Sequence, residues 1–322
     1  MSDSTAIALA QYAMHLGVMP EATMTEALQL QTTEAQHMHW QGSLLQCAFI
    51  TPYCAAESFN QRLLALLDGL LAKMPASPQE QIVYLVLPEF SGPDNPQLNA
   101  LLQQLMQRHP RLLQSEQCRV FPYGAAGCLM ALNAAAGLLA QQPQAQVWLI
   151  ATDSQCHADV FAAYQAQQAA YLLSEGALAL CLTAAESGLA LQFSATDVLS
   201  RTAENHQDLA TAGLFCQVTQ QLAGSGQQLK HICLPDSGND NSSAHWLEQM
   251  PRLHGAINAE TAYSLPSYQT GELGACGGLY RLLCLLQGAQ KGRLHGLTLQ
   301  YEQSAKGYRS VALYNPVVTT HD

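Results

Sequence analysis

Apolar and polar residues alternate along the chain in blocks that predict strands and helices in turn. Runs that are apolar at nearly every position indicate buried strands at residues 82–88, 118–123, 147–150, 174–182, 189–193 and 232–235. Segments with apolar residues at helical spacing predict helices at residues 58–74, 98–108, 124–139, 162–173 and 208–222. Further strands are expected at residues 6–10 and 44–50, and a hairpin at residues 295–314. This alternation predicts an α/β fold with parallel strands and helices on both faces of the sheet.

One apolar helix-forming segment occurs twice. The first copy is Gly124-Ala125-Ala126-Gly127-Cys128-Leu129-Met130-Ala131-Leu132, and the second is Gly274-Ala275-Cys276-Gly277-Gly278-Leu279-Tyr280-Arg281-Leu282. Five positions are identical, each 150 residues apart (274 − 124 = 150). Helices that are apolar on all sides belong inside a protein. Because each copy also leads into a predicted strand, the pattern predicts a duplicated α/β unit. We expect two halves, residues 1–187 and 188–322, that form one compact unit and bury these helices side by side.

The composition narrows the classes of partner. Charged residues make up 11% of the chain, against about 25% in an average protein. The net charge is −11, with 13 Lys and Arg residues and no cationic run. Nucleic acids and anionic membranes both bind clustered cations, so neither is an expected partner. A surface with so few charges fits extensive contacts between protein subunits.

The cysteine pattern favours a reduced compartment. The ten cysteines are scattered, mostly in apolar runs, and none forms the Cys-x-x-Cys spacing of a zinc site. The N-terminal residues lack the basic start and apolar core of a signal peptide, and no apolar run reaches about 18 residues. His37 and His39 stand two apart in a segment predicted as a loop, with no third ligand evident. The chain is expected to be cytoplasmic, without a metal or cofactor.

Three motifs resemble those of the thiolase superfamily, and within it the β-ketoacyl synthases. Residues 124–132 are similar to the segment that holds the nucleophilic cysteine of those enzymes. Residues 174–180, Ser-Glu-Gly-Ala-Leu-Ala-Leu, resemble their Glu-Gly-Ala segment, and residues 273–277 resemble the end of their late histidine motif. The resemblance implies a thiolase-like fold of duplicated αβαβα layers with two pseudo-equivalent halves and buried central helices.

The resemblance also implies chemistry for which this chain lacks the residues. Condensation needs a thiolate at a helix N-terminus, where the helix dipole lowers its pKa. Two imidazoles then stabilise the thioester oxyanion. In the register of the motifs, the nucleophile position is Ala125, and the histidine positions fall at Gly271 and at Pro235 or Asp236. We therefore expect no catalytic residue at these places.

A different register leaves two fallback candidates for catalysis. Cys128 lies about one turn inside the predicted helix, where apolar neighbours would raise the pKa of its thiol. Cys156 and His157 follow a predicted strand, with Asp153 and Asp159 close in sequence. Sites of α/β proteins form at such strand ends. Either thiol could serve an acyltransferase or a condensing enzyme.

Three functions therefore stay open. The first is a catalytically inactive thiolase-fold protein that acts by binding proteins, similar to thiolase-like effector adaptors or chaperones of type VI secretion. The second is a chain-length-factor-like partner of a type II ketosynthase in polyketide, aryl polyene or fatty acid synthesis. The third is an active acyltransferase or condensing enzyme.

The resemblance implies pairing through the strand before the nucleophile helix, here residues 119–123. A homodimer or a heterodimer would result, and the protein partner would be an effector, a ketosynthase or an acyl carrier protein. Pro122 lacks an N–H group, which interrupts continuous strand pairing there.

Overall fold

The computed structural model describes residues 6–17, 35–74, 81–90, 95–198, 209–238 and 240–317. The strands of the first half are β1 (Ala6–Leu16), β2 (Gln36–Trp40), β3 (Ser43–Ala48), β4 (Ile82–Val86), β5 (Arg119–Phe121), β6 (Gln146–Ser154) and β7 (Leu173–Ala185). Those of the second half are β8 (Gly188–Val198), β9 (His231–Cys233), β10 (Ala262–Ser264), β11 (Thr298–Gln303) and β12 (Tyr308–Val317). The helices are α1 (Phe59–Leu71), α2 (Pro96–Arg108), α3 (Ala126–Gln141), α4 (Ala158–Ala166), α5 (Leu209–Ala223), α6 (Asp240–Gln249), α7 (Ser267–Thr270) and α8 (Ala275–Gln290), with a 3-10 turn at Met250–Leu253.

The sheet contains the same strand order twice. The first copy runs β5-β4-β6-β7-β1 and the second runs β10-β9-β11-β12-β8. In each copy the first three strands are parallel and the last two are antiparallel to their neighbours. The copies meet where β1 pairs with β8 at Ala6 and Ile7. The predicted duplication is therefore the architecture of the chain, while the division into folding units at residues 187 and 188 stays a prediction.

The prediction of parallel pairing was wrong for β7 and β1 in the first copy and for β8 in the second, whereas the antiparallel pair of β11 and β12 was predicted as a hairpin. In the second copy, β11 and β12 are separated only by residues 304–307. A parallel pair needs a crossover of about a dozen residues or more, so a connection this short enforces antiparallel pairing. The predicted hairpin is thus correct.

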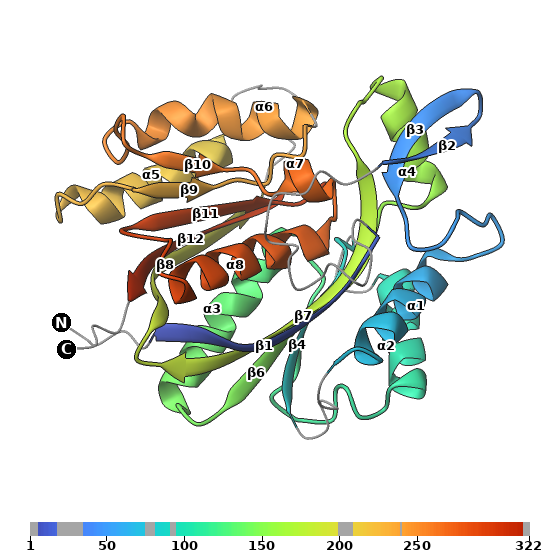
Figure 1. Ribbon diagram of the computed structural model, residues 1–322, viewed down its shortest axis with the longest axis horizontal. Coiled ribbons are helices and arrows are strands. Elements are labelled where there is room, and N and C mark those ends of the chain that lie inside the picture. The colour runs from blue at the N-terminus through green and yellow to red at the C-terminus, as the bar shows by residue number, and fades with distance from the viewer. Residues whose placement is uncertain are drawn as a thin grey trace.

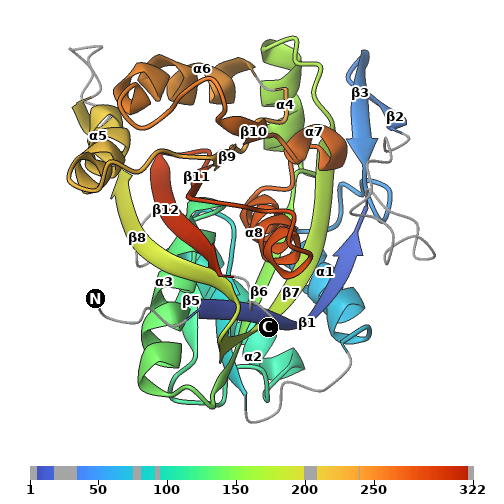
Figure 2. The same cartoon turned by 60° about the vertical axis from the view of Figure 1, so that its left-hand side comes forward.

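Helices and sheet strands form five layers (Figures 1 and 2). α3 and α8 lie side by side in the centre, and the largest apolar cluster joins them to both copies of the sheet. α1 and α2 cover the outer face of the first copy, and α5 and α6 cover that of the second. The chain therefore has the expected αβαβα arrangement with buried central helices. Within the described ranges, no helix is both long and apolar enough to span a membrane.

Two glycines of the repeated motif begin the central helices in equivalent ways. Gly124 has a φ of 59° and Gly274 a φ of 56°, a region that favours glycine. One turn into α8, a Cβ atom on Gly278 would lie 2.7 Å from the carbonyl oxygen of Ala125 and 2.9 Å from Cβ of Cys128. Cys128 and Gly278 occupy the same position of the repeat (278 − 128 = 150). The two helices therefore touch at matching positions.

Several elements differ from the sequence prediction. Residues 36–40 form β2, which pairs with β3, rather than a loop. The segment is mostly polar, and only Met38 and Trp40 on one face of the strand are apolar. These two side chains pack against the aromatic cluster of Phe161. The helix predicted at residues 162–173 is Ala158–Ala166, and it ends just before Gln168, whose φ is 50°. β10 and α7 were not predicted: β10 is as short as β5 and β9 but lacks an apolar run like those that marked them, and α7 is a single four-residue turn.

Glycine-to-alanine substitutions at two positions, with opposite expected effects on stability, test the contact at Gly278. Gly278→Ala should lower the free energy of unfolding by roughly 1–3 kcal/mol, because the new methyl group overlaps Ala125 and Cys128. Gly137→Ala, at an exposed position of α3 with no heavy atom within 4 Å of the added Cβ, should raise it by about 0.5–1 kcal/mol. Urea unfolding of both variants measures this. Equal effects would contradict the close contact.

Candidate functional site

The residue at the start of α3 is Ala125. It is 5% exposed and has helical backbone angles, with φ −59° and ψ −37°. The first backbone N–H of the helix, at Ala126, donates to Oγ of Ser304 at 3.1 Å, and this hydroxyl donates in turn to the carbonyl of Tyr123. The N-terminus of α3 is thus closed by a hydroxyl, and no thiol stands at its first position.

Carboxylates close the start of α8 in a corresponding way. The N–H of Ala275 donates to Oδ2 of Asp153 at 2.7 Å, and the N–H of Gly274 donates to Oε1 of Glu272 at 3.0 Å. Ser304 comes from the second half and caps α3 of the first half, whereas Asp153 comes from the first half and caps α8 of the second. The halves therefore cap each other's central helices.

Burial raises the pKa of both acids at this helix start. Burial raises the pKa of Asp153 to about 7, although the N–H groups of Ala275 and Ser154 lower it in part. Burial likewise raises the pKa of Glu272, against the lowering effect of Arg281 and of two hydrogen bonds. A pair of poorly solvated carboxyl groups thus lies beside the α8 N-terminus.

Gly271 has no room for a side chain. Its φ is 69°, and a Cβ atom would lie 2.4 Å from the carbonyl oxygen of Leu172 and 2.7 Å from Oγ of Ser174. The backbone here pairs with the start of β7: Ser174 N–H donates to Glu272 O at 3.1 Å, and Glu272 N–H donates to Leu172 O at 2.8 Å. An imidazole at this position would require the segment to move.

Asp236 is used within its own loop. Its carboxylate accepts the N–H of Gly238 at 2.9 Å, the geometry of an Asx turn. The neighbouring Ser237 donates to Oε2 of Glu272 at 3.2 Å. This bond brings the loop of Asp236 against the segment of Gly271. Pro235, the alternative position, has no titratable group.

A buried ion pair that the sequence did not predict lies beside these positions. Arg281 of α8 holds Glu302 of β11 through two hydrogen bonds, one of 2.8 Å from Nε, and its third nitrogen donates to Ser267. Both residues are at most 3% exposed. Gln300 donates to Glu302 at 2.8 Å and accepts from Tyr314 at 3.0 Å. Burial alone would lower the pKa of Arg281, but the carboxylate of Glu302 outweighs it and raises this pKa.

The Glu-Gly-Ala segment at residues 174–180 has a structural role. Glu175 is fully buried and binds Arg62 through Oε2 at 2.6 Å and Oε1 at 2.9 Å. A Cβ atom on Gly176 would lie 2.7 Å from the carbonyl oxygen of His15 in β1. The motif therefore fixes β7 to α1 and lets β1 approach closely.

Both fallback thiols are buried. Cys128 is fully buried, and burial raises the pKa of its thiol well above the usual value. Cys156 is 3% exposed in the apolar cluster of Phe161, and burial raises its pKa to about 12. His157 packs its ring on Phe59, with centroids 5.0 Å apart, and burial lowers its pKa. Cys156 and His157 thus have different surroundings although they are adjacent in sequence.

The described ranges contain no cluster of three or more side chains suited to a metal ion. His37 and His39 lie exposed on one face of β2. The described residues contain no group of three or more His, Cys, Asp or Glu side chains that could hold a metal ion.

The fold is similar to that of ketosynthases over nearly the whole chain. A ketosynthase from module 6 of the bacillaene synthase of Bacillus subtilis 168 has a TM-score of 0.68 and 8% identity, covering 98% of this chain and 71% of that one. A chain from the complex of a type II PKS acyl-carrier protein with its ketosynthase has a TM-score of 0.64 and 10% identity. The match covers 98% of this chain and 100% of that one. The ishigamide ketosynthase/chain length factor has a TM-score of 0.61 and 13% identity, covering 97% and 100%.

The likeness to these proteins is structural and does not extend to the sequence. No protein-family model matches the chain, and no curated protein matches it. At these identities the structural likeness establishes the thiolase-like ketosynthase fold.

The Asp153 carboxyl group should make stability depend on pH. Its pKa rises from 3.8 to about 7 on folding, so the folded state retains a proton that the unfolded state has lost between those values. From about pH 5 to about pH 8, this should reduce the free energy of unfolding by roughly 2–3 kcal/mol relative to Asp153→Asn. Unfolding curves of both proteins across this range measure the difference. An unchanged difference at all pH values would contradict the raised pKa.

Proposed function

We propose that this protein is a ketosynthase-like subunit that does not itself condense acyl groups and works as the partner of an active ketosynthase, as a chain length factor does. The observation that carries the proposal is Ala125 at the start of α3, in a chain that has the ketosynthase fold from end to end. A methyl group can neither attack a thioester nor carry an acyl chain.

The surroundings of Ala125 support a binding role rather than a shifted active site. A nucleophilic thiol should be accessible and have a lowered pKa. Cys128 and Cys156 are both buried with raised pKa values. The positions assigned to histidine carry a glycine with no space for a side chain and an aspartate engaged in its own turn.

The partner surface that we propose is the free edge of β5. β5 lies at one end of the sheet, and β4 is the only described strand paired with it. Such an edge offers backbone groups to a strand of another chain. Arg119 is exposed, and Val120 and Phe121 are half-buried. Pro122 ends the strand, so pairing would be short, and side-chain contacts would supply much of the affinity.

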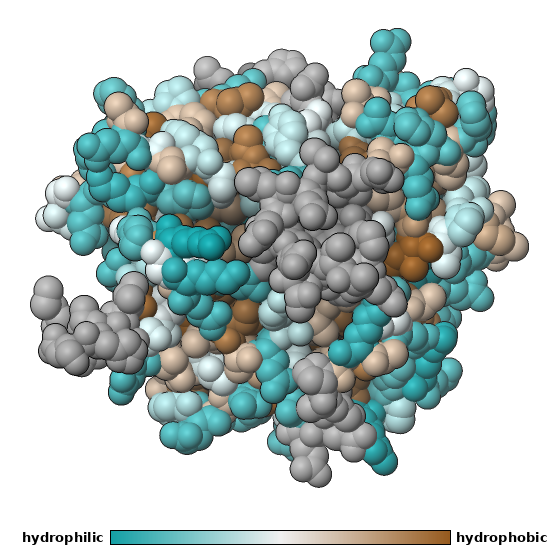
Figure 3. Space-filling view, in the orientation of Figure 1, coloured by the Kyte–Doolittle hydropathy of each residue, from teal (hydrophilic) through white to brown (hydrophobic). Residues whose placement is uncertain are grey.

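The hydropathy of the surface is consistent with a local interface. In the coloured part of Figure 3, hydrophobic residues form small patches among hydrophilic ones rather than one broad area. Among the described residues, the exposed large apolar side chains are dispersed among β3, α2, β8, α6, β10 and α7: Leu44, Met106, Val198, Leu247, Tyr263 and Tyr268. A sheet edge is therefore a better candidate than a single apolar face.

Acyl loading separates this proposal from an active enzyme. Purified protein incubated with acyl-coenzyme A thioesters should gain no acyl mass at Cys128 or Cys156, because both thiols are buried and have raised pKa values. Intact mass spectrometry measures the product, and alkylation of the exposed Cys54 by iodoacetamide is the positive control for thiol detection. A stable adduct that is lost in Cys128→Ala or Cys156→Ala would overturn the proposal.

The two free ends of the sheet provide a matched test of the interface. Tagged protein purified from its native host should retain a ketosynthase, and Val120→Asp in β5 should reduce that yield at least tenfold by placing a charge in the contact. Tyr263→Asp, in β10 at the opposite end of the sheet, should leave it unchanged. Recovery of a secretion component or effector instead would favour the adaptor hypothesis, and equal losses in both variants would contradict a β5 interface.

A further inference from the structure

The ribbon formed by β2 and β3 presents two histidines on one face. β2 pairs with β3 so that His37 lies opposite Gln46 and His39 lies opposite Leu44. Both histidines are exposed, whereas Met38 between them is half-buried against the body of the molecule. Successive side chains of a strand alternate between its faces, so both imidazoles project from the outer face, with their Cα atoms about 6.8 Å apart.

The outer edge of this ribbon is open. β3 is the only described strand that pairs with β2, and the ribbon lies at the side of the molecule away from α5 and α6 (Figures 1 and 2). Edge strands usually carry charges or proline, which prevent pairing with another chain. Residues 36–48 contain neither, although the net charge of the chain is −11. A strand of another molecule can therefore pair with β2 without meeting a charged side chain of the ribbon.

A second copy of the chain has one register on this edge that brings the histidines together. When two β2 strands pair antiparallel about Met38, His37 of one copy lies directly opposite His39 of the other, because both positions are one residue from the centre. Side chains directly opposite each other share a face, with Cβ atoms about 4.5–5.5 Å apart. The four imidazoles then form a rectangle on the outer face of the joined ribbons. Met38 of each copy stays on the inner face.

We propose that His37 and His39 of two copies bind one divalent transition-metal ion, and that this ion joins the copies through β2. Imidazole nitrogen suits Cu²⁺, Ni²⁺ and Zn²⁺. Metal–nitrogen bonds of about 2 Å set neighbouring nitrogens roughly 3 Å apart, so the four side chains lean inward from their Cβ positions. Four nitrogens that approach from one face of a ribbon match the tetragonal geometry of Ni²⁺ and Cu²⁺.

The second copy is needed to complete the site. The described residues of one chain contain no group of three or more His, Cys, Asp or Glu side chains that could hold a metal ion. Across the ribbon, Leu44 has no ligand atom and Gln46 has only an amide oxygen. Two copies double the number of imidazoles, so metal binding and association of the copies stabilise each other. The proposal is independent of pairing with a ketosynthase through β5.

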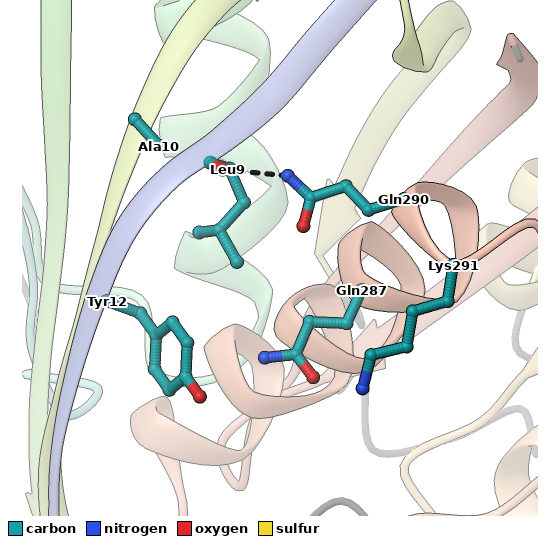
Figure 4. A pocket seen from close by; sticks show the side chains of 6 residues that line it. All are labelled: Leu9, Ala10, Tyr12, Gln287, Gln290 and Lys291. Atoms are coloured by element: carbon teal, nitrogen blue, oxygen red, sulfur yellow. Dashed lines mark hydrogen bonds between the residues drawn. The ribbon is translucent and has the colours of Figure 1, made fainter. Parts of the chain in front are cut away.

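The surface hollow between β1 and the end of α8 has no comparable set of ligands (Figure 4). It is lined by Leu9, Ala10, Tyr12, Gln287, Gln290 and Lys291. The amide of Gln290 already donates to the carbonyl of Leu9 at 2.8 Å, and the ammonium of Lys291 repels a metal cation. Metal binding is therefore expected on β2 and not in this hollow.

Titration of the untagged protein with Ni²⁺ tests stoichiometry and pairing together. Calorimetry should give one Ni²⁺ for every two chains. Light scattering after size exclusion should show that the molar mass doubles with Ni²⁺ and returns to its starting value with EDTA. Val120→Asp in β5 should leave this doubling unchanged, which separates the β2 contact from the one proposed for a ketosynthase.

Variants assign the binding to β2. His37→Gln and His39→Gln should each weaken Ni²⁺ binding at least tenfold and abolish the doubling of mass, because each removes two of the four ligands. His295→Gln removes an exposed imidazole elsewhere and should change neither measurement. Since His37 and His39 are exposed, the melting temperatures of their variants without metal should match that of the original protein, which excludes misfolding as the cause.

Three results would overturn the proposal. They are one Ni²⁺ bound per chain without a change in mass, unchanged Ni²⁺ binding in His37→Gln or His39→Gln, and absence of Ni²⁺ binding at submillimolar concentration.

Discussion

The contact between α3 and α8 is the constraint on which the rest of the structure depends. Each helix is packed against a copy of the sheet, and the two meet where Cys128 faces Gly278. A glycine on one helix lets the other approach to backbone contact, which a larger residue on both would prevent. The separation of the two sheet copies follows from this distance. The glycine-rich starts of both helices are therefore requirements of packing.

Buried charges hold the periphery of this contact in place. In a chain with 11% charged residues, two arginine–glutamate pairs are nearly inaccessible to solvent. Arg281 and Glu302 join α8 to β11, and Arg62 and Glu175 join α1 to β7. Removing one partner of such a pair typically costs about 3–5 kcal/mol, because the other charge is left uncompensated. These pairs fix α8 to β11 and α1 to β7.

The sequence predicted the repeated unit and most strands because those features follow from local periodicity. The two copies of the glycine motif, the uniformly apolar β4 and the hairpin of β11 and β12 could all be read from spacing. β2 was missed because its apolar face, Met38 and Trp40, becomes meaningful only against Phe161, which is more than a hundred residues away. The antiparallel direction of β7 is likewise a tertiary property.

Predicting the candidate site had the same limits. The motif register singled out Ala125, Gly271 and Asp236. The structure has a serine-capped helix start beside the first, no room for a side chain at the second and an Asx turn at the third. The register could not reveal the Arg281–Glu302 pair, since the residues belong to different elements. A single arginine in the apolar run 279–286 and a single glutamate in the strand 298–303 were the available signal, because isolated charges in buried segments need a partner. Whether they paired with each other depended on the fold.

Reciprocal capping of the central helices has a consequence for how the chain can be divided. Ser304 completes the start of α3, and Asp153 completes the start of α8. A fragment containing either half alone would lose the acceptor of one N–H group at the start of its buried helix, that of Ala126 in the first half and that of Ala275 in the second. The two halves resemble one another in topology, yet each lacks one acceptor that the other supplies. We therefore expect them to be inherited, expressed and unfolded as one cooperative body.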